Sequence, residues 1–163
     1  MPHPIVYTGN LDDLIKKWEV QHDKDTAEGA QTFIANGQCA RLVQALTTVG
    51  HSSRWQPGDR VVDIARTLRP GTVIANFKLV DGKLKFPGEH GYHADIFVGV
   101  ERYSNATGKA RRITMFDQWP GSTPRNAHTP GLRGVSAYKA DVAEALQKMP
   151  SDNAEAFYVV LVP

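Results

Sequence analysis

The sequence predicts an α+β fold, with helices first and a mostly antiparallel sheet after them. Two observations lead to this prediction. Apolar residues recur at helical spacing before Pro70, whereas β-branched runs follow it. Glycines and prolines divide the chain into short elements, as is typical of mixed structure. With 163 residues, of which 41% are apolar, the chain has the size of one domain with an ordinary hydrophobic core.

Three helices are expected in the first part of the chain. The first spans 11–20 behind Asn10, a typical N-cap residue, and the polar residues 21–31 are expected to form a connection. A second helix is expected over 37–50, where a glycine ends it, and a third over about 57–68.

Strands dominate the second part. The candidates, which are rich in β-branched and aromatic residues, are 72–77, 93–99, 113–117 and a closing strand at 156–162. Asp81 and Gly82 form a hairpin-type dipeptide, and 101–109 is expected to be a hairpin loop. Residues 120–134, with three prolines and three glycines, predict an irregular surface loop, and 140–149 predict a last helix.

Charge and the N-terminus limit the partners and the location. The 19 basic and 17 acidic residues leave a net charge of +2, which is too balanced to indicate a nucleic-acid partner. No apolar run reaches the roughly 18 residues that a membrane span needs. The first residues lack the pattern of a secretory (Sec) signal, so we expect a protein made in the cytoplasm. The single cysteine excludes an internal disulfide and a cysteine-rich metal site.

Cys39 is the first candidate for chemistry. It is predicted in the first turn of the second helix, where free N–H groups and the helix dipole stabilise a thiolate. A thiolate is the nucleophile of cysteine catalysis, and the backbone N–H there could help to hold an oxyanion. The alternative is a small buried apolar residue on an amphipathic helix.

His93 and Asp117 are the candidates for base and orienting acid. His93 opens one strand and Asp117 ends the next, so a hairpin of the two would bring a carboxylate to the imidazole. Asp95, on the same strand face as His93, is a second candidate for this orienting role. The alternatives are a polar residue at a strand edge for His93 and a loop-opening residue for Asp117.

Other polar and aromatic residues have competing interpretations. His90 with His93, flanked by Glu89 and Asp95, could bind a metal, but two histidines three apart on a strand diverge, so no metal is expected. Trp55, Trp119 and Tyr92 could line a groove for glycan or peptide, although Trp18 and Trp55 are equally explained as core residues. The basic residues are expected to be a solvated surface, namely Arg111, Arg112, Arg125 and Arg133.

Several motifs in order resemble one known superfamily. They are Gly-Gln-Cys-Ala-Arg-Leu-Val-Gln at 37–44, Pro-Gly-Thr-Val-Ile-Ala at 70–75, the histidine strand at 91–99, Phe-Asp-Gln-Trp at 116–119 and the segment 152–157. This series resembles the papain-like amidohydrolases and peptidases that include the CHAP and NlpC-type peptidoglycan hydrolases. The chain departs from the NlpC pattern at Asp117, where that branch usually has a second histidine.

The resemblance implies roles for the site residues. Cys39 would be the nucleophile, His93 the base and then the acid, and Asp117 the orienting residue, with Gln38 near the oxyanion. The substrate would be an amide bond in the peptides of bacterial peptidoglycan, cleaved through a thioester without metal or cofactor.

The resemblance also implies an organisation and a context. One papain-like domain would span 1–163, divided into an N-terminal helical extension (1–36), a catalytic core (37–119) and a loop, helix and closing strand (120–163). Without a Sec signal, such an enzyme would reach the periplasm or cell wall as a secreted antibacterial effector, with a cognate immunity protein, or during phage lysis. Two alternatives stay open: a non-catalytic binding module of the same fold, and an intracellular cysteine hydrolase or acyltransferase.

Overall fold

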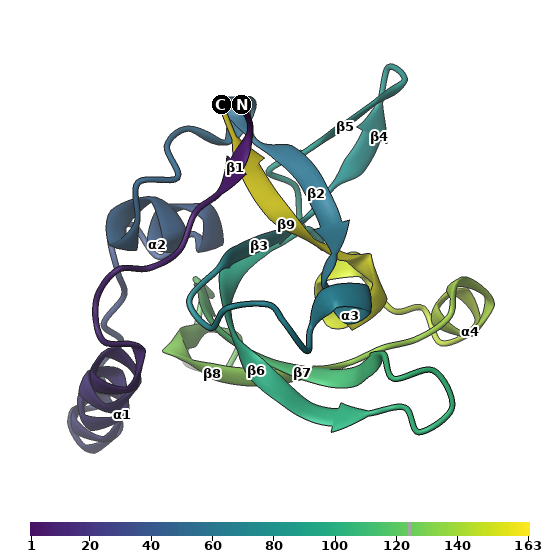
Figure 1. Ribbon diagram of the computed structural model, residues 1–163. Coiled ribbons are helices and arrows are strands. Elements are labelled where there is room, and N and C mark those ends of the chain that lie inside the picture. The colour runs from purple at the N-terminus through teal and green to yellow at the C-terminus, as the bar shows by residue number, and fades with distance from the viewer. Residues whose placement is uncertain (124) are drawn as a thin grey trace.

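An antiparallel sheet forms the centre of the computed structural model, which describes residues 1–123 and 125–163 (Figure 1). Its strand order is β1-β9-β3-β6-β7-β8, and β2 also pairs with β9. These strands are β1 His3–Pro4, β2 Gln56–Arg60, β3 Val73–Asn76, β6 Ala94–Tyr103, β7 Ala110–Trp119, β8 His128–Ser136 and β9 Phe157–Val162. A separate hairpin consists of β4 Lys78–Val80 and β5 Lys83–Lys85.

Short helices surround this sheet. They are α1 Leu11–Glu28, α2 Cys39–Leu46, α3 Val61–Ile64 and α4 Ala140–Ala145, with the 3-10 turns η1 Ser52–Arg54, η2 Pro150–Asp152 and η3 Ala154–Ala156. The structure confirms the α+β class with an antiparallel sheet. Within the described residues, no helix has both the length and the apolar character that a membrane crossing requires.

The sheet is buried on both faces, because each face carries its own hydrophobic core. One core joins Leu42 and Val43 of α2 to Ile96 and Phe116 of the sheet, and the partly buried side of α1 packs against it. The other core joins α3 and η3 to the opposite face and includes Val61, Val62, Ala154, Phe97, Met115 and Phe157. Successive residues of β6 and β7 therefore point into different cores.

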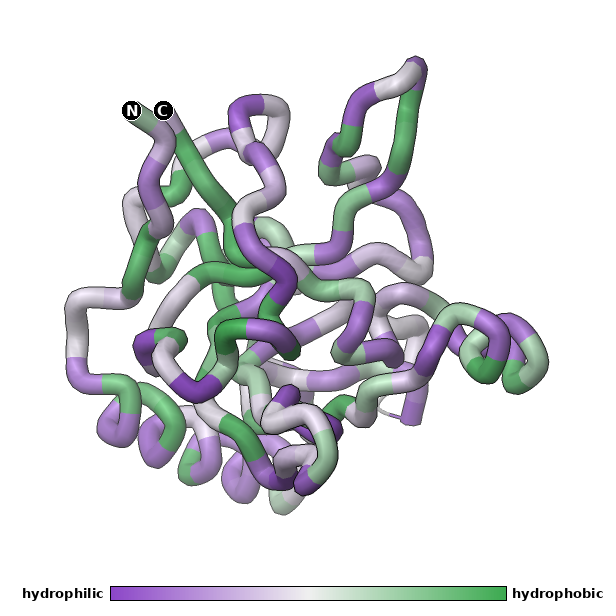
Figure 2. The backbone as a smooth tube through the Cα atoms, turned by 45° about the vertical axis from the view of Figure 1, so that its right-hand side comes forward, coloured by the Kyte–Doolittle hydropathy of each residue, from purple (hydrophilic) through white to green (hydrophobic). Residues whose placement is uncertain are grey.

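Helix α1 is longer than the sequence pattern predicts. Asn10 caps it as expected, accepting the Asp13 N–H at 3.0 Å. The helix then continues through the expected connection at 21–28. Figure 2 shows α1 as mainly hydrophilic. Residues 21–28, the second half of the helix, therefore show no apolar periodicity in the sequence. Side-chain bonds hold it instead, such as Gln21 Nε2 to Asp25 Oδ1 at 2.8 Å.

Three other helix predictions are wrong at their ends. The second helix stops at Leu46, because Thr47 is extended and its hydroxyl donates to Val43 O at 2.7 Å. The expected third helix begins as strand β2, which pairs with β9, and only Val61–Ile64 is helical. The last helix ends at Ala145 rather than near Met149.

The predicted loop at 120–134 is also partly wrong. From His128 onward the chain forms β8, which pairs with β7 so that Asp117 faces Gly131 and Trp119 faces His128. Strand β8 is the edge of the sheet, where a proline such as Pro130 is tolerated. Pro124 lies outside the described residues.

The main strand predictions are confirmed. Strands β3, β6, β7 and β9 lie within or over the expected ranges, and β6 and β7 form the expected hairpin. Asp81 and Gly82 have φ values of 51° and 77°, as the tight β4–β5 turn requires. The closing strand pairs with β1, His3 opposite Val162, so the two ends of the chain lie side by side (Figure 1).

Candidate active site

Cys39 is the first residue of α2 and follows a tight turn at 34–38. Gly37 has a φ of 87°, and a Cβ there would lie 3.2 Å from the Phe33 ring, so this position favours glycine. The thiol is partly exposed. The backbone N–H groups of Ala94 and Ala40 near the sulfur help to lower the pKa of the thiol, which favours the thiolate.

His93 lies immediately before β6, with its backbone held by Asn76 of β3. Its N–H donates to Asn76 Oδ1 at 2.9 Å, and its carbonyl accepts the Asn76 N–H at 2.9 Å. The amide nitrogen of Asn76 in turn donates to the carbonyls of Pro150 and Ala156. Asn76 is fully buried, so these bonds fix the place from which the His93 ring extends.

The structure brings Cys39, His93 and Asp117 together. Nε2 of His93 lies 2.8 Å from Oδ2 of Asp117, across the β6–β7 hairpin. The ring also lies close enough to the Cys39 thiol for each group to shift the pKa of the other. Because Nε2 is engaged by Asp117, Nδ1 is the nitrogen left for the sulfur. The three groups thus form one continuous chain of contacts.

The electrostatics of this chain favour a charged pair. Burial alone would raise the pKa of the Cys39 thiol, but the neighbouring His93 ring and its charge lower it below its ordinary value. Burial opposes protonation of His93, yet Asp117 and Cys39 outweigh it and raise its pKa from 6.5 to about 10. The site is therefore expected to hold a thiolate and an imidazolium at neutral pH.

Asp117 is fully buried and has two further neighbours, Arg133 and His128. Arg133 Nε donates to Oδ2 at 2.8 Å, and His128 Nε2 lies 2.8 Å from Oδ1. The His128 contact is short but lacks the alignment of a hydrogen bond. Burial opposes ionisation of Asp117, but His128, His93 and the Arg133 charge outweigh it and lower the pKa of Asp117. The carboxylate therefore stays ionised.

The expectation that Arg133 is a solvated surface residue is wrong. Its side chain is only 14% exposed. Besides Asp117 it donates to Asp152 Oδ1 at 3.2 Å and Ser151 O at 3.0 Å. The guanidinium also lies over the Trp119 ring, 5.3 Å from its centroid. Arg133 thus belongs to the buried surroundings of the site.

Asp95 lies beside this group without joining it. The register of β6 and β7 places it opposite Asp117, and it is fully buried. Neither carboxylate oxygen has a hydrogen-bond partner among the described residues. Burial, reinforced by the nearby Asp117 charge, raises the pKa of Asp95 well above its ordinary value. Asp95 makes no hydrogen bond that would orient the His93 ring, whereas Asp117 contacts the ring directly.

The described residues contain one group with metal-ligand spacing, formed by His93, Asp95 and Asp117, whose ligand atoms lie within 4.8 Å of one another. His90 is exposed and stands outside this group, and Glu89 pairs with Lys78 at 2.9 Å. Oδ2 of Asp117 already accepts from His93 and Arg133. A cation would have to share the Asp117 carboxylate with these two donors, so the arrangement favours proton chemistry.

The predicted aromatic residues divide into two kinds. Trp55 is 4% exposed, packs on Phe86 and donates to Gly50 O, so it belongs to the core rather than to a groove. Trp119 is half-buried, meets the His93 ring edge-on at 5.8 Å and lies 4.6 Å from the His128 ring. Tyr92 is also half-buried. Gln38 is exposed at the start of α2, where its side chain makes no capping bond.

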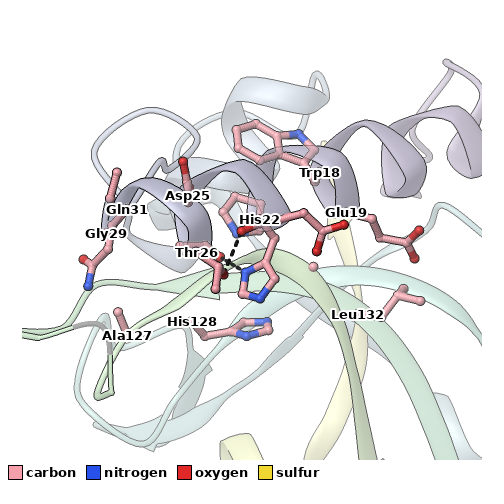
Figure 3. Close-up of a pocket in the computed structure, with 15 residues that line it drawn as sticks. Trp18, Glu19, His22, Asp25, Thr26, Gly29, Gln31, Ala127, His128 and Leu132 are labelled. Carbon is pink, nitrogen blue, oxygen red and sulfur yellow. Dashed lines mark hydrogen bonds between the residues drawn. The ribbon is translucent and has the colours of Figure 1, made fainter.

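A pocket of about 650 Å³ lies behind this group, between α1 and β8. Figure 3 shows Glu19, His22 and Thr26 of α1 on one side and His128 and Leu132 of β8 on the other. Cys39 does not line it. The pocket therefore approaches the Asp117 carboxylate through His128 and does not include the thiol.

A thiol, an imidazole and a carboxylate grouped in this order are the groups that cysteine-dependent hydrolases use. The chain belongs to the domesticated amidase effector 2 family, whose model matches residues 14–160. It is also similar to a solved structure, a Type 6 secretion amidase effector 2 (Tae2), with a TM-score of 0.57 and 28% identity. That comparison covers 82% of this chain and 88% of the other. No curated protein matches the chain.

Proposed function

We propose that the chain hydrolyses an amide bond in the peptides of bacterial peptidoglycan, with Cys39 as nucleophile, His93 as base and then acid, and Asp117 as orienting residue. The observation that carries the proposal is the grouping of the Cys39 thiol, the His93 ring and buried Asp117, in which His93 lowers the pKa of the thiol and lies 2.8 Å from the carboxylate. The amidase effector family supports amide cleavage. The amidase effector family and the Tae2 neighbour support peptidoglycan as the substrate, and we propose in addition that the fold is papain-like, of the CHAP and NlpC type.

Acylation would begin from the thiolate and imidazolium. The sulfur attacks the amide carbonyl carbon, and the negative charge moves to the carbonyl oxygen. The Cys39 N–H lies at the start of α2, where no helical acceptor uses it, so it is placed to donate to this oxyanion. The His93 imidazolium then gives its proton to the leaving nitrogen, the C–N bond breaks, and a thioester remains on Cys39.

Deacylation would use the same groups in reverse. Neutral His93 takes a proton from water, the resulting hydroxide attacks the thioester, and the C–S bond breaks to release a carboxylic acid and the thiolate. Asp117 keeps the ring in one orientation and stabilises its charged form throughout. Trp119, Tyr92 and Gln38 are the candidates for contacts with the substrate, because they lie beside Cys39 or His93 and remain accessible.

The test is digestion of purified peptidoglycan, followed by mass spectrometry of the fragments. We expect new amine and carboxyl ends with the wild type and none with Cys39→Ala or His93→Ala. His90→Ala is the matched control, because His90 is exposed and outside the contact chain. Activity should survive a chelator. Cleavage by a folded Cys39→Ala variant, or binding without cleavage by the wild type, contradicts the proposal, and the latter outcome supports a binding module.

The proposed substrate sets the context. Peptidoglycan lies outside the cytoplasm, so the enzyme would act in the periplasm or cell wall of a target cell after export by a contact-dependent secretion system. The name of the Tae2 neighbour supports this route. A cognate immunity protein would protect the producer. We also propose that residues 37–119 form the catalytic core. Arg133 and His128, which follow this range in the sequence, contact Asp117.

A further inference from the structure

Gln118 is a buried side chain next to the proposed catalytic carboxylate. It follows Asp117 on β7, so its side chain points to the opposite face of the sheet. Asp117 faces the imidazole, whereas Gln118 reaches the turn at 34–38 that precedes Cys39. Gln118 is fully buried, and the mechanism above does not use it.

Three hydrogen bonds join Gln118 to this turn. Its Oε1 accepts the Ile34 N–H at 2.9 Å, and its Nε2 donates to Ile34 O at 2.8 Å and to Gln38 O at 3.1 Å. Both hydrogens of the amide nitrogen are thus used. The first two bonds pair the side-chain amide with the backbone of one residue, and the third reaches the residue directly before Cys39.

The turn needs such a support. Ala35 and Gly37 both have left-handed backbones, with φ values of 52° and 87°, and an alanine rarely adopts this conformation. Its internal bonds are Gly37 N–H to Ile34 O at 3.1 Å and Gln38 N–H to the Asn36 side chain at 3.1 Å. Neither of these bonds ties the turn to the sheet, whereas Gln118 does.

The third bond of Gln118 acts at the start of α2. Gln38 O accepts both Gln118 Nε2 and the Leu42 N–H, which forms the first helical bond. Moving this carbonyl would therefore move the first turn of the helix, which carries the Cys39 sulfur and the Cys39 N–H. Both atoms have to keep their distance from His93 during the proposed reaction.

We propose that Gln118 is a positioning residue that fixes the Cys39 sulfur and N–H relative to the His93 ring. The inference rests on the proposed function. Asp117 holds the imidazole on one face of β7 and Gln118 holds the thiol turn on the other, so one strand sets the geometry of the pair. Asn76 has the corresponding role for the His93 backbone, although it lies on β3.

The test uses Gln118→Met, which keeps the length of the side chain and removes the three bonds. Gln44→Met is the matched control on α2, since the Gln44 side chain bonds only to exposed Arg41. We expect kcat on peptidoglycan to fall about 100-fold with little change in KM, as a displacement of about 1 Å can cause. The pH midpoint of Cys39 alkylation by iodoacetamide should rise. Gln44→Met should match the wild type in both measurements.

A second variant separates positioning from simple destabilisation. Gln118→Glu keeps the acceptor for the Ile34 N–H and, in the protonated form that burial favours, one of the two donors, so its loss of kcat should be smaller than that of Gln118→Met. A lower melting temperature with wild-type kcat and alkylation profile in the folded variants would overturn the proposal. Alkylation of Cys39 needs no substrate, so it tests Gln118 even if the wild-type protein does not cleave peptidoglycan. In that case the proposed function is refuted, and a shifted alkylation profile in the Gln118 variants still supports the positioning role.

Discussion

Asp117→Asn tests the electrostatic link at the centre of the site. The change keeps the volume of the side chain and removes the charge that faces Nε2 of His93 at 2.8 Å. The pKa of His93 rises from 6.5 to about 10 in the folded protein. That rise corresponds to ~5 kcal/mol in favour of the imidazolium, at about 1.4 kcal/mol for each pKa step.

Asp117 and Cys39 share this effect. If Asp117 supplies about half of it, its loss removes on the order of 2–3 kcal/mol, which is one to two orders of magnitude in the population of the thiolate–imidazolium pair. We therefore expect the pH midpoint of Cys39 alkylation to rise by about 2 units. The chain has 1 cysteine, so the alkylation rate reports on this thiol alone.

The control for this experiment is Asp152→Asn. Asp152 contacts Arg133 at 3.2 Å, and its side chain is 46% exposed, so its loss should leave the midpoint in place. A folded Asp117→Asn variant whose alkylation midpoint stays within about 0.3 units of the wild type refutes the reasoning, because the carboxylate would then have no part in ionising the pair.

Two further predictions concern the surroundings of Asp117. Arg133→Met leaves a buried carboxylate without its guanidinium, so we expect the free energy of unfolding to fall by ~3 kcal/mol and the melting temperature to fall by roughly 6–12 °C. Arg133→Lys should lose less stability. Calorimetry that shows both variants to be as stable as the wild type would contradict the buried ion pair. The pKa of Asp95 in the folded protein is raised above 3.8. Its contribution to the free energy of unfolding is therefore fully present below pH 3.8 and is lost as the pH rises towards the pKa of the folded state. Asp95→Asn should therefore gain stability relative to the wild type as the pH increases from 4 to 8 in thermal melts, whereas a difference that does not change with pH would show Asp95 to be ionised.

Short sequence patterns predicted those helices and strands that are determined by neighbouring residues in the chain. The hairpin of β6 and β7, the closing strand and the helix start at Cys39 were accessible because alternation, a turn dipeptide and a glycine before the cysteine are short-range signals. The second half of α1 was not, because polar side chains support it through bonds such as Gln21 to Asp25. Strand β2 has no β-branched residue and exists because β9 offers a pairing partner.

The same distinction applies to the site. Cys39, His93 and Asp117 each carry a residue type and a position that indicate chemistry, and the structure places them in contact. Arg133 has no such signal, since it stands in a segment rich in glycine and proline and acts through a buried partner 16 residues away. The partner of Gln118 is 84 residues away. Bonds of this kind follow from tertiary packing, which no short window of sequence contains.

The placement of Asp117 and Gln118 on consecutive positions of β7 constrains how such a chain can evolve. An insertion or deletion of one residue before Asp117 in this strand would exchange the two faces, turning the carboxylate towards the backbone turn and the amide towards the ring. Both partners would be lost in a single mutational step, and neither could be repaired alone. Length changes among descendants should therefore accumulate in the connecting segments, while this dipeptide is inherited as a unit.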